Sequence, residues 1–388
     1  MQIYLDYSAT TPQRQEVTEK VQQVATSQWG NSSSLHIWGE RAAFLLEEAR
    51  FKVSRLINAP DPNTITFTSG GTEANNLAIF GITRQYRQPQ HLIISEVEHS
   101  AIAEPVKFLE QQGWQVTRLG VNPQGRVNPE DLQASIQSNT VLISMIYGQS
   151  EVGTLQPIER LARIACDRGV LFHTDAVQVA GRLPLDVQQL GADLLSLSSH
   201  KLYGPQGMGA LYVRRGVKLF PLLMGGGQEG GLRSGTQAIA PIAGFGVAAE
   251  LALQNLELER SRLRELRDLL FESLADCPYL VPTGDRLHRL PHHVSFCLTS
   301  PLAGEVTGKA IVRQMNLAGI AISAGSACHS GKLSPSPILK AMGYDDAMAL
   351  AGIRFSLGKD TTQADIEWTA MVLKQVLGRF LAKMTVLR

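Results

Sequence analysis

The sequence has no excess of one charge and no long hydrophobic run. Its 36 Lys and Arg residues are balanced by 35 Asp and Glu residues, which gives a formal net charge of +1 over 388 residues. This balance excludes the classes of protein that bind nucleic acid or membrane surfaces through bulk positive charge. The longest apolar run, residues 238–249, is too short to cross a bilayer. We therefore expect neither a nucleic-acid partner nor a membrane partner.

Cysteine is also scarce. The chain has Cys166, Cys277, Cys297 and Cys328, and no two of them form a Cys-x-x-Cys pair. This excludes a zinc ribbon, a thioredoxin-type motif and a disulfide framework. The N-terminus also lacks the basic stretch followed by an apolar stretch that a signal peptide requires. The sequence predicts a protein of the reducing cytoplasm without a metal site.

The first two thirds of the chain alternate short apolar segments with helical patterns. The apolar segments are residues 65–68, 92–94, 141–146, 170–173, 194–197 and 210–213. Because buried strands that alternate with helices form parallel sheets, this order predicts an α/β fold with a mainly parallel sheet.

The pattern changes after about Pro241, where one long helix to about Ala275 is predicted. Strands and helices in mixed order follow it, which is typical of a smaller α+β domain. We assign the large domain to residues 13–255 and the small one to residues 256–388, on which residues 1–12 can also pack. No Pro/Ser-rich linker marks the boundary.

Glycine, by contrast, is abundant, and its 35 residues gather in clusters. One cluster, Gly70-Gly71, stands between a predicted strand and a predicted helix that begins near Thr72. Free backbone N–H groups and the positive end of a helix meet at such a point, which suits a phosphate group. The alternative is an ordinary turn in which Thr72 caps the helix.

Asp175 and Lys201 follow two successive predicted strands. Ligands of α/β proteins bind at such strand ends. A phosphate site, a carboxylate for the ring nitrogen and a lysine for a Schiff base are the groups that pyridoxal 5'-phosphate requires. His99, which follows another apolar strand, is a candidate to lie over the ring. The alternatives are a helix-capping Asp and a surface His.

Several segments together resemble the cysteine desulfurases of the NifS/IscS type. These enzymes form the long-loop branch of the class V aminotransferases and share the aspartate-aminotransferase fold, pyridoxal-phosphate fold type I. The resemblance covers nearly the whole chain, and its motifs occur in the order of the family. The segments are residues 4–12, 68–76, 198–205, 233–236, 323–328 and 353–358.

The resemblance implies which residues hold the cofactor. Lys201 would form the Schiff base, Asp175 would pair with the ring nitrogen and Gln178 would contact the ring oxygen. In the position of Ser150, relatives commonly have an Asn that also touches this oxygen. The residues that would bind the phosphate are Gly71, Thr72, Ser198, His200 and, from the neighbouring subunit of an obligate homodimer, Thr236.

The resemblance also implies the reaction, which converts L-cysteine to L-alanine. His99 would help to move protons, and Arg354, assisted by Asn31, would bind the substrate carboxylate. Cys328 would take the sulfur as a persulfide and pass it to an acceptor protein, for iron–sulfur clusters, other sulfur-containing cofactors or tRNA. The neighbouring His329 favours a thiolate at Cys328.

Two departures from the family and three other interpretations remain. Besides Ser150, the chain has Ser32 where the family commonly has Pro, and it stops soon after its last predicted helix, so that scaffold recognition is in doubt.

A cystine or selenocysteine lyase and another pyridoxal-phosphate enzyme would not need Cys328, and a regulatory protein would not need Lys201. A metal site from His292, His293 and Cys297 is disfavoured, because the adjacent residues His292 and His293 point to opposite faces of a strand.

Overall fold

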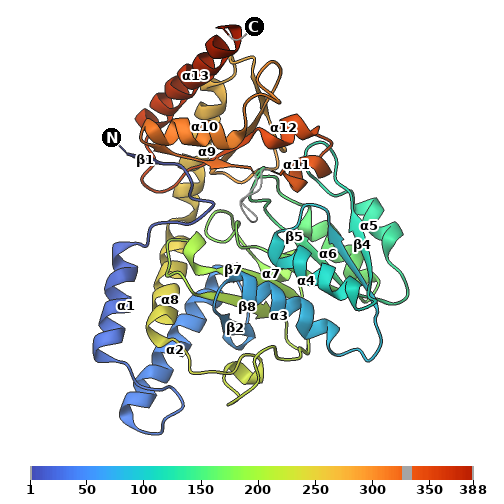
Figure 1. Cartoon of the computed structure of the whole chain (residues 1–388). Coiled ribbons are helices and arrows are strands. Elements are labelled where there is room, and N and C mark those ends of the chain that lie inside the picture. The colour runs from blue at the N-terminus through green and yellow to red at the C-terminus, as the bar shows by residue number, and fades with distance from the viewer. Residues whose placement is uncertain (1, 326–333, 387–388) are drawn as a thin grey trace.

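The computed structural model describes residues 2–325 and 334–386, and its larger part is built around a seven-stranded sheet (Figure 1). The strand order is β2-β8-β7-β6-β5-β3-β4, and all neighbours are parallel except β8, which is antiparallel to β2 and to β7. The strands are β2 (Ile65–Thr68), β3 (His91–Ser95), β4 (Gln115–Leu119), β5 (Thr140–Ile146), β6 (Leu171–Asp175), β7 (Leu194–Ser198) and β8 (Gly209–Val213). The predicted α/β fold with a mainly parallel sheet is confirmed.

Both faces of this sheet are covered. Successive strand residues point to opposite sides, and the apolar residues on each side belong to a separate core. Ile143 and Met145 of β5 belong to the apolar core on one face, and Leu142 belongs to the core on the other. The first core includes residues of α1 (Gln15–Ser27), α2 (Ile37–Leu56), α5 (Pro129–Ser135), α6 (Ile158–Asp167) and α7 (Val187–Leu190). The second includes residues of α3 (Gly71–Thr83) and α4 (Ser100–Gln111).

The helix predicted from Pro241 to Ala275 is two helices, α8 (Ile239–Gln254) and α9 (Leu256–Ser273), which are bent by 70° around Asn255. The reason is that the two halves pack on different cores. α8 contacts α1 and α2, whereas α9 contacts α13 (Gln363–Val386). No single helix in the described ranges has the length and apolar character to cross a membrane, and this bent pair meets the criterion by length and composition only.

The upper part of Figure 1 has its own apolar core under a four-stranded antiparallel sheet. The strand order is β12-β13-β10-β9. These strands are β9 (Leu280–Pro282), β10 (His293–Leu298), β12 (Ser323–Ala324) and β13 (Gly352–Ser356). The helices of this part, besides α9 and α13, are α10 (Gly308–Leu317), α11 (Pro337–Ala341) and α12 (Asp346–Leu350). The domain boundary at residue 255 stays a prediction.

The N-terminal segment connects the two parts. Strand β1 (Ile3–Tyr4) is parallel to β11 (Ile320–Ala321), and Asp6 forms a β-bridge with Ser356 of β13. A few residues later the chain reaches the larger part, where the amide of Thr11 donates to the His200 carbonyl at 3.1 Å. One short segment therefore contacts both parts of the fold.

Candidate active site

A cavity of about 790 Å³ lies between the large sheet, the N-terminal segment and the second sheet. The carboxyl ends of β6 and β7 open into it, as expected for a parallel sheet. It brings together most of the predicted site residues. Those that line it are Gly71, Thr72, His99, Ser150, Asp175, Gln178, Ser198, His200, Lys201 and Arg354.

Cys328, the predicted sulfur carrier, lies outside the described residues. The described residues on either side of it, Ser323 to Gly325 and Ser334 with Pro335, line the cavity. Gly325 and Ser334, the described residues that flank residues 326–333, therefore both lie at the predicted site.

One end of the cavity is formed by the start of α3. Within the described part of the chain, no side chain caps this helix, so that its first N–H groups are not used by a cap. A Cβ atom at Gly71 would lie 2.8 Å from Val177 Cγ2 and 3.4 Å from Ser198 Cβ. Only glycine leaves this space free, and an anion at this point would meet the positive end of the helix.

Lys201 follows β7 and is nearly enclosed. Its Nζ atom donates to the backbone carbonyls of Ser8 at 2.6 Å and Ala9 at 2.7 Å. Burial, with a smaller contribution from the Arg354 guanidinium, lowers the pKa of Lys201 to about 8. About one tenth of a lysine with this pKa is neutral at pH 7, far more than of an ordinary lysine, and the neutral form is the one that a nucleophilic or proton-accepting amine needs.

Asp175 is the last residue of β6 and is buried. Its carboxylate accepts from Asn75 Nδ2 at 2.7 Å and from the Val177 amide at 3.0 Å. Nearby, the Glu98 carboxyl accepts from Ser95 Oγ at 2.5 Å and from the Ile146 amide at 2.9 Å. Burial raises the pKa of Glu98 to about 8, so that Asp175 has a largely neutral acid beside it at pH 7.

Arg354, from β13, also lines the cavity. Its Nη2 atom donates to Asp6 Oδ1 at 2.6 Å, and its Nη1 atom donates to the Ser150 carbonyl at 3.0 Å. That carbonyl also accepts from His293 Nε2 at 3.0 Å. Ser150, which stands where relatives commonly have the Asn that touches the cofactor, lines the cavity, and its backbone carbonyl orients Arg354.

The remaining predicted residues of the cavity have partners that fix their place. His200 Nδ1 lies 3.0 Å from Thr10 Oγ1, and burial lowers the pKa of His200 to about 4, so that the ring is neutral at pH 7. Gln178 donates to the Ser8 carbonyl at 2.9 Å. His99 Nδ1 accepts from the Ala101 amide at 3.1 Å and so caps α4. This contact leaves His99 Nε2 as the ring atom available to a ligand.

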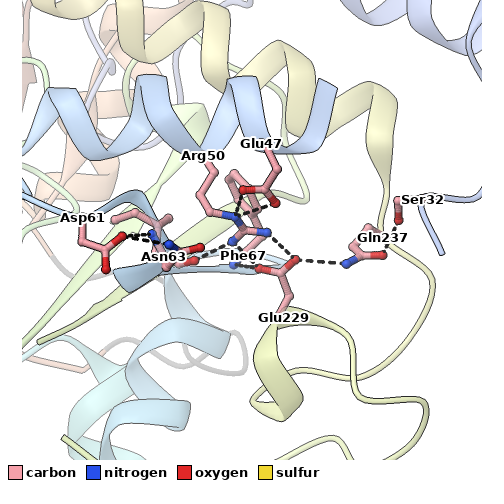
Figure 2. A network of polar contacts seen from close by, with 9 residues as sticks. Ser32, Glu47, Arg50, Asp61, Asn63, Phe67, Glu229 and Gln237 are labelled. Atoms are coloured by element: carbon pink, nitrogen blue, oxygen red, sulfur yellow. Dashed lines mark hydrogen bonds and ion pairs between the residues drawn. The ribbon is translucent and has the colours of Figure 1, made fainter. Parts of the chain in front are cut away.

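Asn31 and Thr236 do not line the cavity and are exposed. Their segments are joined by the polar network of Figure 2, in which Ser32 Oγ donates to Gln237 Oε1 at 2.8 Å. Gln237 in turn donates to Glu229, which is paired with the buried Arg50. Ser32 stands where the family commonly has Pro, and its hydroxyl ties the loop of Asn31 to the segment of Thr236.

The sequence did not point to four polar residues around the cavity: Asp6, Asn75, Glu98 and Glu151. Asn75 and Glu98 lie next to predicted residues in the sequence, but a buried Asn on a helix and a buried Glu have no pattern of their own. Burial raises the pKa of Glu151 to about 8, and its Oε1 atom has no hydrogen-bond partner in the described structure.

The residues of the cavity fit pyridoxal phosphate. Gly71 and the start of α3 leave room for a phosphate, Asp175 presents a buried carboxylate and Lys201 presents an amine of lowered pKa. Buried polar atoms without a partner surround the same space in the described ranges: Asn75 Oδ1, Glu98 Oε2, Glu151 Oε1 and Arg354 Nε. A polar ligand would satisfy such atoms, because leaving them unpaired is costly.

His292 and His293 have separate structural roles. His292 Nε2 lies 3.4 Å from Ser8 Oγ, whereas His293 contacts the Ser150 carbonyl. Burial lowers the pKa of both rings well below the usual value, so that both are neutral at pH 7. Within residues 2–325 and 334–386, no group of three or more His, Cys, Asp and Glu side chains could share a metal ion.

Comparison with known proteins gives one answer over nearly the whole chain. Residues 3–368 match the family described as aminotransferase class-V. The chain is 43% identical over 380 residues to the cysteine desulfurase IscS of Dictyoglomus turgidum, covering 97% of this chain and 94% of the relative. It is 40% identical over 382 residues to the IscS of Methylobacillus flagellatus, covering 97% and 92%. A solved NifS-like protein superposes with a TM-score of 0.90 at 31% identity, covering 97% of this chain and 100% of that one.

Proposed function

The chain belongs to the class V aminotransferase family, as a pyridoxal-phosphate-dependent cysteine desulfurase, and we propose that the cavity described above is where it takes sulfur from L-cysteine. The observation that carries this proposal is the meeting of Lys201, Asp175 and Arg354 in one cavity. Asp175 comes from β6, Lys201 from the turn after β7 and Arg354 from β13, and together they offer a carboxylate, an amine and a carboxylate-binding cation. This set suits an amino-acid substrate and the cofactor of the family.

Lys201, Asp175, Gln178, Ser198, His200 and the start of α3 at Gly71 and Thr72 would hold pyridoxal phosphate. When bound, this cofactor supplies an electron sink that weakens the bonds at the α-carbon of an amino acid. The buried Asp175 carboxylate would keep a proton on the ring nitrogen, and the neutral Glu98 adds no second full charge there. The Asn75 amide holds Asp175 in place for this role.

Lys201 Nζ and His99 Nε2 would move protons. Since the pKa of Lys201 is lowered to about 8, its neutral form is available to accept the α-proton of the substrate and to return it. His99 lies at the rim of the cavity with Nδ1 already used by the cap of α4. Its Nε2 atom is therefore the one that can exchange a proton with the substrate.

Arg354 would bind the substrate carboxylate. Its planar guanidinium can offer two parallel N–H bonds, which Lys cannot do. Asn31 was predicted to assist, but in the described chain it lies outside the cavity. We keep this role for Asn31 only in a dimer, where its loop and that of Thr236 would face the neighbouring subunit.

Cys328 would carry the sulfur. Its thiolate Sγ would attack the substrate sulfur, a bond between the two sulfur atoms would form, and the bond between the substrate sulfur and its carbon would break. The balance is that L-cysteine and the Cys328 thiol give L-alanine and a Cys328 persulfide, with no external oxidant or reductant. The persulfide would then pass its outer sulfur to an acceptor protein, for iron–sulfur clusters, other cofactors or tRNA.

A homodimer is the second part of the proposal, and it is supported by an exposed apolar stripe on α2. Ile37, Phe44 and Phe51 are seven residues apart and are 48%, 70% and 50% exposed, with Trp38 at 47% beside them. Residues with this spacing share one helix face, and such a patch marks an interaction surface. Light scattering of the cofactor-loaded protein should give twice the mass of the chain, and a fully active monomer would contradict the dimer. The cytoplasmic location stays a prediction, which cell fractionation tests.

The test of the reaction uses absorbance and alanine release. The purified protein with pyridoxal phosphate should have a visible absorption band that shifts when cysteine is added, and it should release one alanine for each sulfur transferred. Cys328→Ala should keep the spectral shift and lose alanine release from cysteine, whereas the control Cys166→Ala should behave as the wild type. Alanine release at the wild-type rate from Cys328→Ala would contradict the proposal and favour a lyase.

A further inference from the structure

The ion pair between Arg354 and Asp6 has no place in the roles assigned above. The two side chains are 10% and 21% exposed, and Arg354 Nη2 donates to Asp6 Oδ1 at 2.6 Å. A charge-assisted hydrogen bond in such a partly enclosed place is stronger than one in water. Asp6 does not line the cavity, so that it affects a ligand there through Arg354, which it contacts, and through its charge, which raises the pKa of Lys201.

The guanidinium of Arg354 is held at two of its nitrogens. Asp6 accepts from Nη2, and the Ser150 carbonyl accepts from Nη1 at 3.0 Å. Two acceptors on different nitrogens fix both the position and the rotation of a planar group. Nε is buried and has no hydrogen-bond partner among the described residues, and Arg354 lines the cavity. The guanidinium is therefore held in one orientation with donor capacity left over.

The same short segment also holds Lys201. We call residues 6–11 the N-terminal strap. Its Ser8 and Ala9 carbonyls accept from Lys201 Nζ at 2.6 and 2.7 Å, two and three residues after Asp6. Its ends are fixed to the two parts of the fold, because Asp6 forms a β-bridge with Ser356 and the amide of Thr11 donates to the His200 carbonyl.

We propose that Asp6 is a positioning residue, which holds Arg354 in the orientation that receives the substrate carboxylate and sets its place relative to Lys201 through the strap. This inference rests on the proposed function, because it needs an amino-acid substrate in the cavity. The opposite relation is that the Asp6 carboxylate competes with the substrate for Arg354. When the Asp6 charge is removed, the KM for L-cysteine should rise if Asp6 positions Arg354 and should fall if Asp6 competes with the substrate.

The experiment compares Asp6→Asn with the wild type in the cofactor-loaded protein. Loss of the charge frees the guanidinium to turn, so that KM for L-cysteine should rise about tenfold while kcat stays within about twofold. L-Alanine and ethylamine, which is alanine without its carboxylate, serve as competing ligands. Inhibition by alanine should weaken about tenfold, and inhibition by ethylamine should not change.

The control is Asp360→Asn, which removes one negative charge from a residue that is 63% exposed and whose partner is Lys359. It should leave both inhibition constants unchanged. An unchanged or lower KM in Asp6→Asn, or an equal loss for alanine and ethylamine, overturns the proposal. If Asp6→Asn does not fold, Asp6→Glu keeps the charge and displaces it by one methylene group, and unchanged alanine inhibition in that variant overturns the proposal.

The inference and the proposed function can fail separately. Wild-type protein that releases no alanine from cysteine contradicts the proposed function. Wild-type protein that releases alanine, together with an Asp6→Asn variant of the same KM, contradicts only the role of Asp6.

Discussion

Two groups of residues at the cavity, which we call the lysine end (Asp175 and Lys201) and the arginine end (Asp6, Ser150 and Arg354), are built in different ways. The lysine end comes from consecutive strand–loop units of one mainly parallel sheet, because Asp175 is the last residue of β6 and Lys201 ends the short turn that follows β7. The arginine end is assembled from Asp6, Ser150 and Arg354, whose contacts join residues 348 and 204 positions apart. The lysine end can therefore be predicted from local sequence motifs, whereas the arginine end depends on how distant segments of the chain pack together.

The largest effect is expected at the lysine end. Lys201→Ala should remove the visible absorption band of the bound cofactor and reduce alanine release by about 10⁴-fold or more, because the same amine binds the cofactor and moves the proton. Absorbance and alanine assays measure both. A variant that keeps the band and releases alanine would show that another lysine does this work, and the contrast between the two ends would lose its basis.

A smaller effect is expected at the arginine end. Arg354→Lys keeps the charge and loses the planar pair of donors, so that the substrate carboxylate loses about 1.5–3 kcal/mol of binding, or about 10- to 150-fold in KM. The visible band should remain, because Arg354 does not hold the cofactor. Steady-state kinetics and a spectrum of the same sample measure the two quantities. Loss of the band in this variant would contradict the separation of the two ends.

The pH dependence of the free energy of unfolding tests the role of Glu98, the buried carboxyl beside Asp175 at the lysine end. Burial raises the pKa of Glu98 to about 8, so that the native state binds a proton more tightly than the unfolded state. The contribution of Glu98 to the free energy of unfolding is therefore fully present below the unfolded pKa of about 4.5. It is lost as the pH rises toward 8, and the loss is a few kcal/mol at most. In Glu98→Gln, urea denaturation of the cofactor-free protein should show a flatter decline over this range. The same slope as the wild type would show that Glu98 is not the source.

The smallest effect is expected from Ser150→Asn. The backbone carbonyl of residue 150 keeps its contacts to Arg354 and His293, and the longer side chain can add one hydrogen bond to a ligand, about 0.5–1.5 kcal/mol. Cofactor affinity, measured by titration of the cofactor-free protein, should be equal or up to about tenfold tighter. A weaker affinity would mean that the Ser150 hydroxyl has a role that the Asn amide cannot fill.

The sequence predicted the mainly parallel sheet, and it placed Asp175 and Lys201 where the structure brings them into one cavity, because both features depend on local patterns. β6 and β7 are buried strands that begin with apolar residues, and Asp175 ends β6 while Lys201 follows β7. Strand β4 was not predicted, because it is a partly exposed edge strand of mixed residues, QVTRL, without the apolar run. The bend at Asn255 was missed for another reason, since helical propensity continues across it and only packing on two cores breaks it.

The arginine end was predicted only in its central residue. The segment of Arg354 resembles a family motif, but no local pattern shows that Asp6 or the carbonyl of Ser150 would hold its guanidinium. The pairing of β1 with β11 brings Asp6 to this place, and a strand of two residues has too short a pattern to predict. Buried carboxyls such as Glu151 are invisible for the same reason, because burial is a property of the whole fold.

The measurement that tests the central claim most directly is mass spectrometry of the cofactor-loaded protein after it reacts with L-cysteine. The account predicts one extra sulfur atom on the peptide that contains Cys328 and none on the peptides of Cys166, Cys277 and Cys297, with one alanine released for each sulfur gained. Alanine released in the same amount with no extra sulfur on Cys328 would contradict it.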